Sequence, residues 1–137
     1  MSRTTPISQL MTTHVRTLDV DAKLSEARRL FTEERIHHLP IVERRVVVGL
    51  LSSRDLVGIL REANAGGSES VDSILDRCSS IRQAMSTPLV TLHPDDTVER
   101  AIDLIADGSI HSLLVLDADR RLAGIVTDTD LLDYLCD

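Results

Sequence analysis

The stretch GLLSSRDL, residues 49–56, occurs again in altered form as GIVTDTDL, residues 124–131. Both copies have a glycine, two apolar residues, a hydroxyl residue, two variable positions, an aspartate and a leucine. The apolar residues predict the end of a strand, and the pattern Ser/Thr-x-x-Asp predicts the start of a helix. In a capping box the hydroxyl and the acid bind amides of their own helix, whereas a binding role would direct the acid toward a ligand.

The whole chain is a repeat built around this motif. With Ile7 placed over Ile81, ISQLMTTHVRTLDVD lies over IRQAMSTPLVTLHPD, and RIHHLPIV lies over SIHSLLVL. One extra residue in the DADRR turn of the second copy keeps the two motifs aligned. A repeat of this length is typical of a small βαββα unit and not of a solenoid. We therefore expect repeat 1 at residues 7–62, repeat 2 at residues 81–137, and between them a linker with a helical end at residues 63–80.

Periodicity predicts the same elements in both repeats. A short helix or turn and an extended piece come first, followed by a helix that Asp21 opens in repeat 1 and that Asp95 or Asp96 caps in repeat 2. Two apolar strands joined by a turn then form a hairpin, and a last helix closes the unit. The residues predicted to face inward from that last helix are Leu56, Val57, Ile59 and Leu60 in repeat 1, and Leu131, Leu132 and Leu135 in repeat 2.

Composition places the chain among soluble globular proteins. It has 137 residues, of which 42% are hydrophobic and 27% charged, and a formal net charge of −7. One tyrosine, one phenylalanine and no tryptophan leave few platforms for base stacking, and the negative field repels phosphate backbones. No apolar run reaches the length of a membrane span, and the N-terminus lacks the apolar core of a signal peptide. We expect a cytoplasmic protein whose partners are neither nucleic acid nor membrane.

No arrangement of residues predicts catalysis or a metal site. A nucleophile elbow, a phosphate-cradling glycine loop and a metalloprotease motif are absent from the sequence. None of the five histidines forms an i, i+4 pair with an acidic partner, and DADRR is better explained as a hairpin turn than as a cation site. Cys78 and Cys136 are far apart and have no motif around them, so we expect reduced thiols. We expect no enzyme activity, no metal site and no obligatory cofactor.

The order, spacing and duplication of these pieces resemble the cystathionine beta-synthase (CBS) domain family. The matching pieces are the opening I-x-x-x-M, the helix start D-x-x-L/V-x-x-A, the strand start I-H-x-L-P and the motif G-h-h-[ST]-x-x-D. The resemblance covers nearly the whole chain as a tandem pair, a Bateman module. It implies an α/β (α+β) fold in which two βαββα CBS repeats pack with pseudo-twofold symmetry. It also implies a homodimer that binds adenosine-containing ligands in clefts between the repeats.

The resemblance also assigns roles to residues of and around the motif. An aspartate at a helix start can accept hydrogen bonds from both ribose hydroxyls, and a helix N-terminus suits a phosphate. The residues assigned to ribose are Ser52, Asp55, Thr127, Asp130, Thr17 and Thr91. Those expected to form an apolar wall for adenine are Ile36, Pro40, Ile110 and Leu114. The candidates for phosphate contact are Arg35, His37, His38, Arg54 and His111.

Each of these assignments has a plainer alternative. The hydroxyl and acid of each motif could serve only as helix caps, the arginines could be solvated helix residues, and the histidines could be ordinary polar residues where a strand begins. The second motif is the less basic one, since Thr129 stands where the first has Arg54 and since Asp128 adds a negative charge.

The expected function is regulatory ligand sensing in signal transduction. The module would bind an adenine nucleotide (AMP, ADP or ATP) or S-adenosylmethionine and signal to a regulated protein whose identity the sequence does not reveal; whether magnesium accompanies a nucleotide stays open. The alternative is a non-catalytic homodimeric interaction scaffold with unoccupied ligand sites. Intact aspartates in both motifs favour the sensing role.

Overall fold

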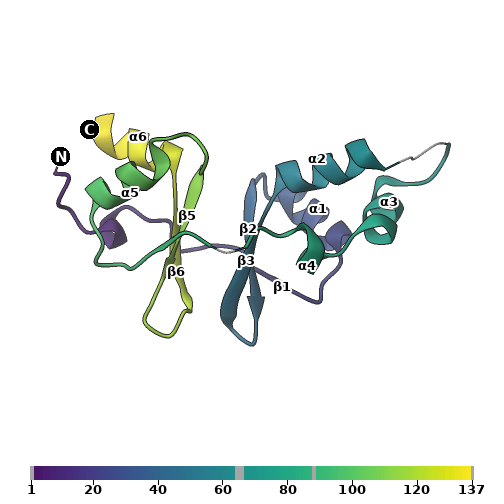
Figure 1. Ribbon diagram of the computed structural model, residues 1–137, viewed down its shortest axis with the longest axis horizontal. Coiled ribbons are helices and arrows are strands. Elements are labelled where there is room, and N and C mark those ends of the chain that lie inside the picture. Colours follow the sequence, from purple (N-terminus) through teal and green to yellow (C-terminus); the bar gives the residue numbers. More distant parts are fainter. Residues whose placement is uncertain (1, 64–66, 88, 137) are drawn as a thin grey trace. The chain divides into compact units, whose positions relative to one another are not determined.

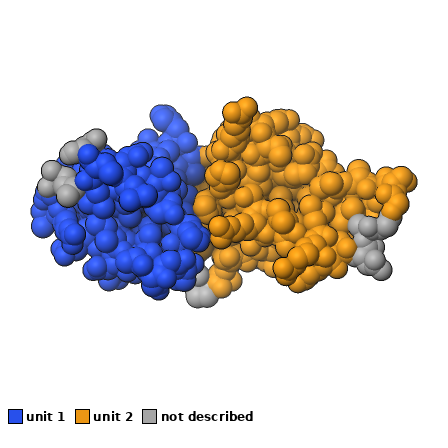
Figure 2. All heavy atoms as spheres, turned by 90° about the horizontal axis from the view of Figure 1, so that it is seen from above, with its two compact units in different colours: residues 1–15, 90–137 blue, residues 16–89 orange. Residues whose placement is uncertain are grey.

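The chain folds into two compact units, each with its own three-stranded sheet and covering helices. The computed structural model describes residues 2–63, 67–87 and 89–136. The middle unit contains residues 16–89, and the terminal unit joins residues 1–15 to residues 90–137 (Figure 2). The α/β fold class expected from the sequence is confirmed.

The middle unit has the βαββα order of a repeat, followed by two further helices (Figure 1). Its elements are β1 (Leu18–Asp19), α1 (Leu24–Glu33), β2 (His38–Glu43), β3 (Val46–Ser52), α2 (Ser53–Glu62), α3 (Val71–Cys78) and α4 (Ile81–Ala84). β1 pairs with β2 in parallel, and β2 pairs with β3 in antiparallel orientation. α3 is the helical end expected for the linker, while residues 64–66 of that linker lie outside the described residues.

The terminal unit repeats this order around a second sheet. Its elements are η1 (Ile7–Gln9), β4 (Thr91–Leu92), α5 (Val98–Ile105), β5 (Ser112–Leu116), β6 (Leu122–Thr127) and α6 (Asp128–Cys136). β4 pairs with β5 in parallel, and β5 pairs with β6 in antiparallel orientation. Among the residues that the structure describes, no helix is both long and apolar enough to cross a bilayer.

The compact units do not coincide with the sequence repeats, because the opening segments are exchanged. Ile7, from the start of repeat 1, lies fully buried in the core of the terminal unit, and Ile81, from the start of repeat 2, in the core of the middle unit. After each opening helix one residue pairs with the free edge of the sheet: Thr12 with Ile125, and Ser86 with Leu50. The segment that opens one repeat therefore completes the core of the unit built around the other.

The caps of the two first helices differ from the sequence prediction. α1 begins at Leu24 after Lys23, whose side chain makes no capping bond, so Asp21 does not cap it. Instead Asp76 of α3 accepts a hydrogen bond from the Ser25 amide at 2.9 Å. α5 is capped by Thr97, whose hydroxyl accepts from the Arg100 amide at 3.2 Å, and not by Asp95 or Asp96. Since Asp96 instead binds the His93 amide at 2.8 Å, it stabilises the preceding turn.

The helix that closes each βαββα set, α2 in the middle unit and α6 in the terminal unit, also corrects the prediction. Leu56 and Leu131 face inward as expected and are buried. Val57 is 64% exposed and Leu132 is 61% exposed, so these two apolar residues point away from their own cores. They occupy the same place in the two repeats, one position after the buried leucine.

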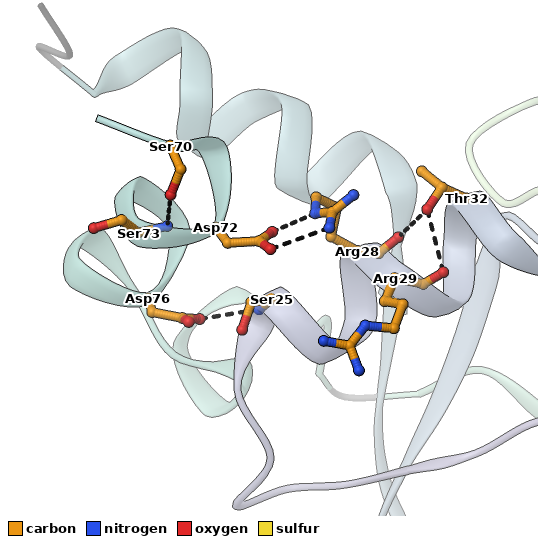
Figure 3. Close-up of polar contacts among 8 residues, drawn as sticks. All are labelled: Ser25, Arg28, Arg29, Thr32, Ser70, Asp72, Ser73 and Asp76. Atoms are coloured by element: carbon orange, nitrogen blue, oxygen red, sulfur yellow. Dashed lines mark hydrogen bonds and ion pairs between the residues drawn. The ribbon is translucent and has the colours of Figure 1, made fainter. Parts of the chain in front are cut away.

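α3 is held against α1 by both apolar and charged contacts. Ile74 and Leu75 are buried, and Leu75 belongs to the core of the middle unit. The Arg28 guanidinium of α1 donates to both carboxylate oxygens of Asp72, through Nε to Oδ1 and through Nη2 to Oδ2 at 3.1 Å (Figure 3). This bidentate geometry fixes the orientation of α3 as well as its position.

The Arg28–Asp72 pair predicts a loss of stability in acid. The Arg28 guanidinium, by hydrogen bonding and by its charge, holds the pKa of the Asp72 carboxyl below its ordinary 3.8. A carboxylate with a depressed pKa in the folded state stabilises the fold above its ordinary pKa and loses that effect as the pH falls through the lower value. Asp72→Asn is therefore expected to lower the midpoint of urea unfolding at pH 7, and the difference from wild type should shrink below about pH 4.

Urea unfolding of both proteins between pH 7 and pH 2.5 measures this effect. Asp119→Asn, in the exposed hairpin turn of the terminal unit, is the matched control and should leave the profile unchanged. An Asp72→Asn midpoint equal to that of wild type at pH 7 would show that the pair adds nothing to stability.

Candidate functional site

The first motif forms the junction between β3 and α2. Ser52 ends the strand and is the N-cap of the helix, and its hydroxyl accepts a hydrogen bond from the Asp55 amide at 3.3 Å. In return the Asp55 carboxylate Oδ2 accepts from the Ser52 amide at 2.8 Å. The pair is a complete capping box, with both side chains half-buried.

The second motif has the same geometry between β6 and α6. The Thr127 hydroxyl accepts from the Asp130 amide at 3.2 Å, and the Asp130 Oδ2 accepts from the Thr127 amide at 2.9 Å. The capping interpretation is thus confirmed for both motifs. Within the described part of the chain, Oδ1 of Asp55 and Oδ1 of Asp130 accept no hydrogen bond. Each carboxylate therefore keeps one oxygen for a further donor.

The hairpin brings the start of one strand beside the motif at the end of the next. Ser52 is paired with His38 across the β2–β3 ladder, and the Ser53 amide donates to the His37 carbonyl at 3.0 Å. In the terminal unit, Thr127 is paired with Ser112. The structure thus places the two histidines His37 and His38 next to the first capping box.

The terminal unit has the same backbone bond but a different charge. The Asp128 amide donates to the His111 carbonyl at 3.2 Å. The Asp128 carboxylate lies 3.6 Å from Nδ1 of His111, an ion pair when the imidazole is protonated. The corresponding residue in the middle unit is Ser53, which carries no charge. Sequence spacing could not indicate this pair, because the hairpin joins residues that are distant along the chain.

The two arginine candidates occupy different positions. Arg54 is exposed on the first turn of α2, beside the first motif. Arg35 is exposed after the end of α1, with a left-handed φ of 53°. It is therefore not a helix residue, as the plainer alternative assumed, but ends the helix in a conformation that usually favours glycine.

The threonine and apolar candidates are less uniform. Thr91 lies in β4 opposite Leu114, whereas Thr17 is exposed just before β1. Leu114 is 1% exposed and Pro40 is also buried, so neither presents much side-chain surface to a ligand. The half-buried Ile36 and Ile110, which lie just before the strands β2 and β5, are the better candidates for an adenine wall.

No metal centre accompanies these residues in the described ranges. Within them, no group of three or more histidine, cysteine, aspartate or glutamate side chains is arranged to hold a metal ion. The free cysteines Cys78 and Cys136 are both exposed.

Comparison with known proteins identifies the repeats. A family model described as CBS domain matches residues 7–62 and 79–137. The CBS domain-containing protein YhcV of Bacillus subtilis is 31% identical over 125 residues, which are 91% of this chain and 81% of that protein. The homoserine O-acetyltransferase of Methanohalobium evestigatum is 30% identical over 128 residues, or 93% of this chain. The chain spans only 23% of the length of that enzyme.

Solved structures share the fold over almost the whole chain. The CBS domain pair of protein MJ0100, in complex with 5′-methylthioadenosine and S-adenosyl-L-methionine, superposes with a TM-score of 0.81 at 23% identity over 96% of both chains. CBSX2 in complex with AMP superposes with a TM-score of 0.79 at 19% identity, again over 96% of both chains.

Proposed function

The chain belongs to the CBS domain family, and from that premise we propose that it is a regulatory module that binds an adenosine-containing ligand at its motifs and signals to a partner protein. Two similar structures contain such ligands: S-adenosyl-L-methionine with 5′-methylthioadenosine in one, and AMP in the other. In this proposal the module does no chemistry itself. It acts as a homodimer. Ligand binding changes the affinity of the module for the partner protein by some factor, and binding of the partner changes the affinity for the ligand by the same factor.

The geometry of the two aspartates supports this proposal most directly. Asp55 and Asp130 each bind one backbone amide through Oδ2, which fixes the carboxylate, and each keeps Oδ1 for another donor. A carboxylate held in this way can accept a ribose hydroxyl without losing its helix cap. A charge-assisted hydrogen bond contributes about 1.5–3 kcal/mol, which corresponds to tenfold or more in affinity.

Charge distinguishes the two proposed sites. Beside the first motif, Arg54 and His37 can contact a phosphate at the N-terminus of α2. Beside the second motif, Asp128 lies near His111 and would compete with a phosphate for that imidazole. We expect the middle unit to take the phosphate-bearing nucleotide AMP, ADP or ATP, with or without magnesium. The terminal unit suits a ligand with a neutral or positive group, such as S-adenosylmethionine.

One observation favours a second candidate function, a homodimeric interaction scaffold with empty sites. Both motifs are complete capping boxes, so the helix starts alone can account for their hydroxyl and acidic residues. This alternative predicts that no adenosine-containing ligand stabilises the protein.

Ligand-induced stabilisation separates the two functions. The purified chain is heated with AMP, ADP, ATP, S-adenosylmethionine, 5′-methylthioadenosine and guanosine controls, with and without magnesium. A ligand at 100 times its dissociation constant should add about 2.7 kcal/mol, which raises the melting temperature by several degrees. No shift with any adenosine-containing ligand at millimolar concentration would overturn the sensing function and leave the scaffold.

The variant Asp55→Asn tests the role of the carboxylate without removing the cap. Its amide oxygen can still accept from the Ser52 amide, but it loses the negative charge, so affinity should fall tenfold or more while stability stays near wild type. Asp55→Ala also removes the hydrogen bond from the Ser52 amide to the carboxylate, while the Ser52 hydroxyl still caps the helix, and should cost about 1 kcal/mol of stability. Asp72→Asn is the charge-matched control outside the motifs, and calorimetry should find its affinity for the ligand unchanged. Equal affinities for Asp55→Asn and wild type would exclude Asp55 from the site.

A further inference from the structure

The turn between β2 and β3 consists of two arginines in an unfavourable backbone conformation. Glu43 pairs with Val46 across the hairpin, so the loop holds only Arg44 and Arg45. Their φ angles are 52° and 68°, both in the left-handed region. A two-residue loop with positive φ at both positions favours Asn-Gly, because most side chains are strained there. The hairpin therefore gives up stability by holding arginine at both positions.

The charge of these two arginines is not neutralised within the described part of the chain. Both side chains are exposed, and among the described residues neither guanidinium makes a hydrogen bond or an ion pair. The adjacent carboxylate of Glu43 is already bound, since it accepts from Nη2 of Arg82 at 2.9 Å. The Arg44–Arg45 tip thus presents two guanidinium groups, each of which can bind a carboxylate through two parallel hydrogen bonds.

The corresponding turn of the terminal unit has arginines without this excess of charge. Arg120 has a left-handed φ of 62°, and Arg121 follows it. Asp117 and Asp119 stand in the same turn, and Oδ1 of Asp117 accepts from the amides of Asp119 and Arg121, both at 2.9 Å. The two acidic and two basic residues make this turn neutral. Both turns therefore hold arginine at a strained position, but the positive charge is left uncompensated in the β2–β3 turn.

The tip is remote from the proposed ligand site of its own unit. β3 begins directly after Arg45 and ends at Ser52, the N-cap of α2. At about 3.3 Å per residue, the strand separates its two ends by about 20 Å. Figure 1 shows the β2–β3 turn pointing away from α1 and α2. A partner bound at the tip would therefore leave the motif around Asp55 open to a ligand.

We propose that the Arg44–Arg45 tip docks an acidic segment of the partner protein, a choice of partner that rests on the proposed function. Each guanidinium binds one carboxylate of that segment. Such a contact explains why the turn keeps arginine where Asn-Gly would be more stable, since functional sites retain residues that cost stability. A nucleic acid or an anionic membrane fits the tip less well. A phosphate backbone is held by many cationic contacts, and the net charge of −7 repels it.

Replacing the turn by the residues that its backbone favours separates charge from fold. Arg44→Asn with Arg45→Gly should raise the midpoint of urea unfolding, because the left-handed strain is relieved. The same variant should bind an octaglutamate peptide about tenfold more weakly than wild type at low ionic strength, because two ion pairs are lost. Nuclear magnetic resonance titration of the peptide into isotope-labelled protein measures the affinity. In wild type the amides of residues 43–46 should shift.

Arg120→Asn is the matched control, since it removes a left-handed arginine from the neutral turn. It should also raise the unfolding midpoint, and it should leave peptide binding unchanged. The proposal is overturned by peptide-induced shifts that lie elsewhere in the protein, or by equal peptide affinities for wild type and Arg44→Asn with Arg45→Gly. An unfolding midpoint of that variant no higher than that of wild type would also overturn it.

Two further titrations separate this docking from other anions and from the proposed ligand site. Tighter binding of phosphatidylserine vesicles or of a DNA oligonucleotide at the tip would establish a phosphate ligand and overturn the acidic segment. All titrations are made without nucleotide. Thermal shifts with the adenosine-containing ligands are measured on Arg44→Asn with Arg45→Gly and should equal those of wild type. Failure of ligand sensing and failure of docking at the tip therefore give different results.

Discussion

A fragment of residues 16–89 is expected to fold by itself, whereas a fragment of residues 1–62 is expected to stay unfolded. Residues 16–89 are the compact middle unit. Residues 1–62 are repeat 1 with the six residues that precede it. The difference lies in α3 and α4. Leu75 and Ile81 are both fully buried in the core of the middle unit, and the 1–62 fragment lacks both.

The same fragment also leaves a core residue without its partners. Ile7 packs with Leu92, Val98 and Leu113 of the terminal unit, all of which the 1–62 fragment lacks. Losing a single fully buried aliphatic side chain typically costs about 2–5 kcal/mol, and a small domain has little stability to spare. The loss of both Leu75 and Ile81 should therefore exceed the stability of the remaining unit.

Circular dichroism and urea unfolding of the two purified fragments measure this difference. Residues 16–89 should give a helical spectrum and a cooperative transition, and residues 1–62 should give neither. Ile81→Ala in the longer fragment is the internal control and should lower its transition midpoint strongly. A cooperative transition for residues 1–62 would mean that each sequence repeat folds without the exchanged segment.

The order of elements could be predicted from sequence because each strand and helix has a local pattern. Leu24, Ala27 and Phe31 recur at helical spacing and are buried on one face of α1, and β3 alternates between buried and half-buried residues. The exchange of opening segments could not be predicted, because Ile7 and Ile81 are aligned in sequence and either unit offers an equivalent core. Only the three-dimensional contacts show that Ile7 enters the core of the terminal unit and Ile81 that of the middle unit.

The capping errors have a similar physical origin. The cap of α1 comes from Asp76, which is 51 residues away from Ser25, so no local pattern could indicate it. At α5, Asp95, Asp96 and Thr97 are all acceptable caps by residue type. In the structure the Asp96 carboxylate accepts from the His93 amide in the preceding turn, and Thr97 is left as the N-cap of α5.

For the motifs, the sequence offered the capping hydrogen bonds as one of two interpretations, but it could not indicate which carboxylate oxygen the cap would use. Ser-x-x-Asp defines a capping box by spacing alone, and both boxes form. Whether Oδ1 meets a ligand depends on what surrounds it in three dimensions. The outward positions of Val57 and Leu132 were mispredicted for a related reason: an apolar residue beside a buried leucine fits either face of a short helix until its contacts are known.

Each motif opens with a glycine, and replacing either glycine by alanine should destabilise the protein. We expect Gly124→Ala to lower the free energy of unfolding by about 2–3 kcal/mol, and Gly49→Ala to lower it by less. A Cβ added at Gly124 would lie 2.7 Å from Sδ of Met11 and 2.8 Å from the carbonyl oxygen of Thr12. That carbonyl cannot easily retreat, because it accepts from the Ile125 amide at 3.0 Å while the Thr12 amide donates to the Ile125 carbonyl at 2.9 Å.

At Gly49 the nearest atoms that an added Cβ would meet all belong to the side chain of Met85. A methionine side chain is flexible and can move aside at modest cost.

Double-variant cycles in urea separate the two cases. In Gly49→Ala with Met85→Ala the glycine substitution should lose most of its cost, because Sδ and Cγ of Met85 are removed and only the Cβ at 3.1 Å remains. In Gly124→Ala with Met11→Ala most of the penalty should remain, since the backbone carbonyl of Thr12 stays in place. The contrary result would be that Met11→Ala relieves Gly124→Ala as fully as Met85→Ala relieves Gly49→Ala. Side-chain crowding alone would then explain both glycines, and the backbone pairing of Thr12 with Ile125 would not be the reason for Gly124.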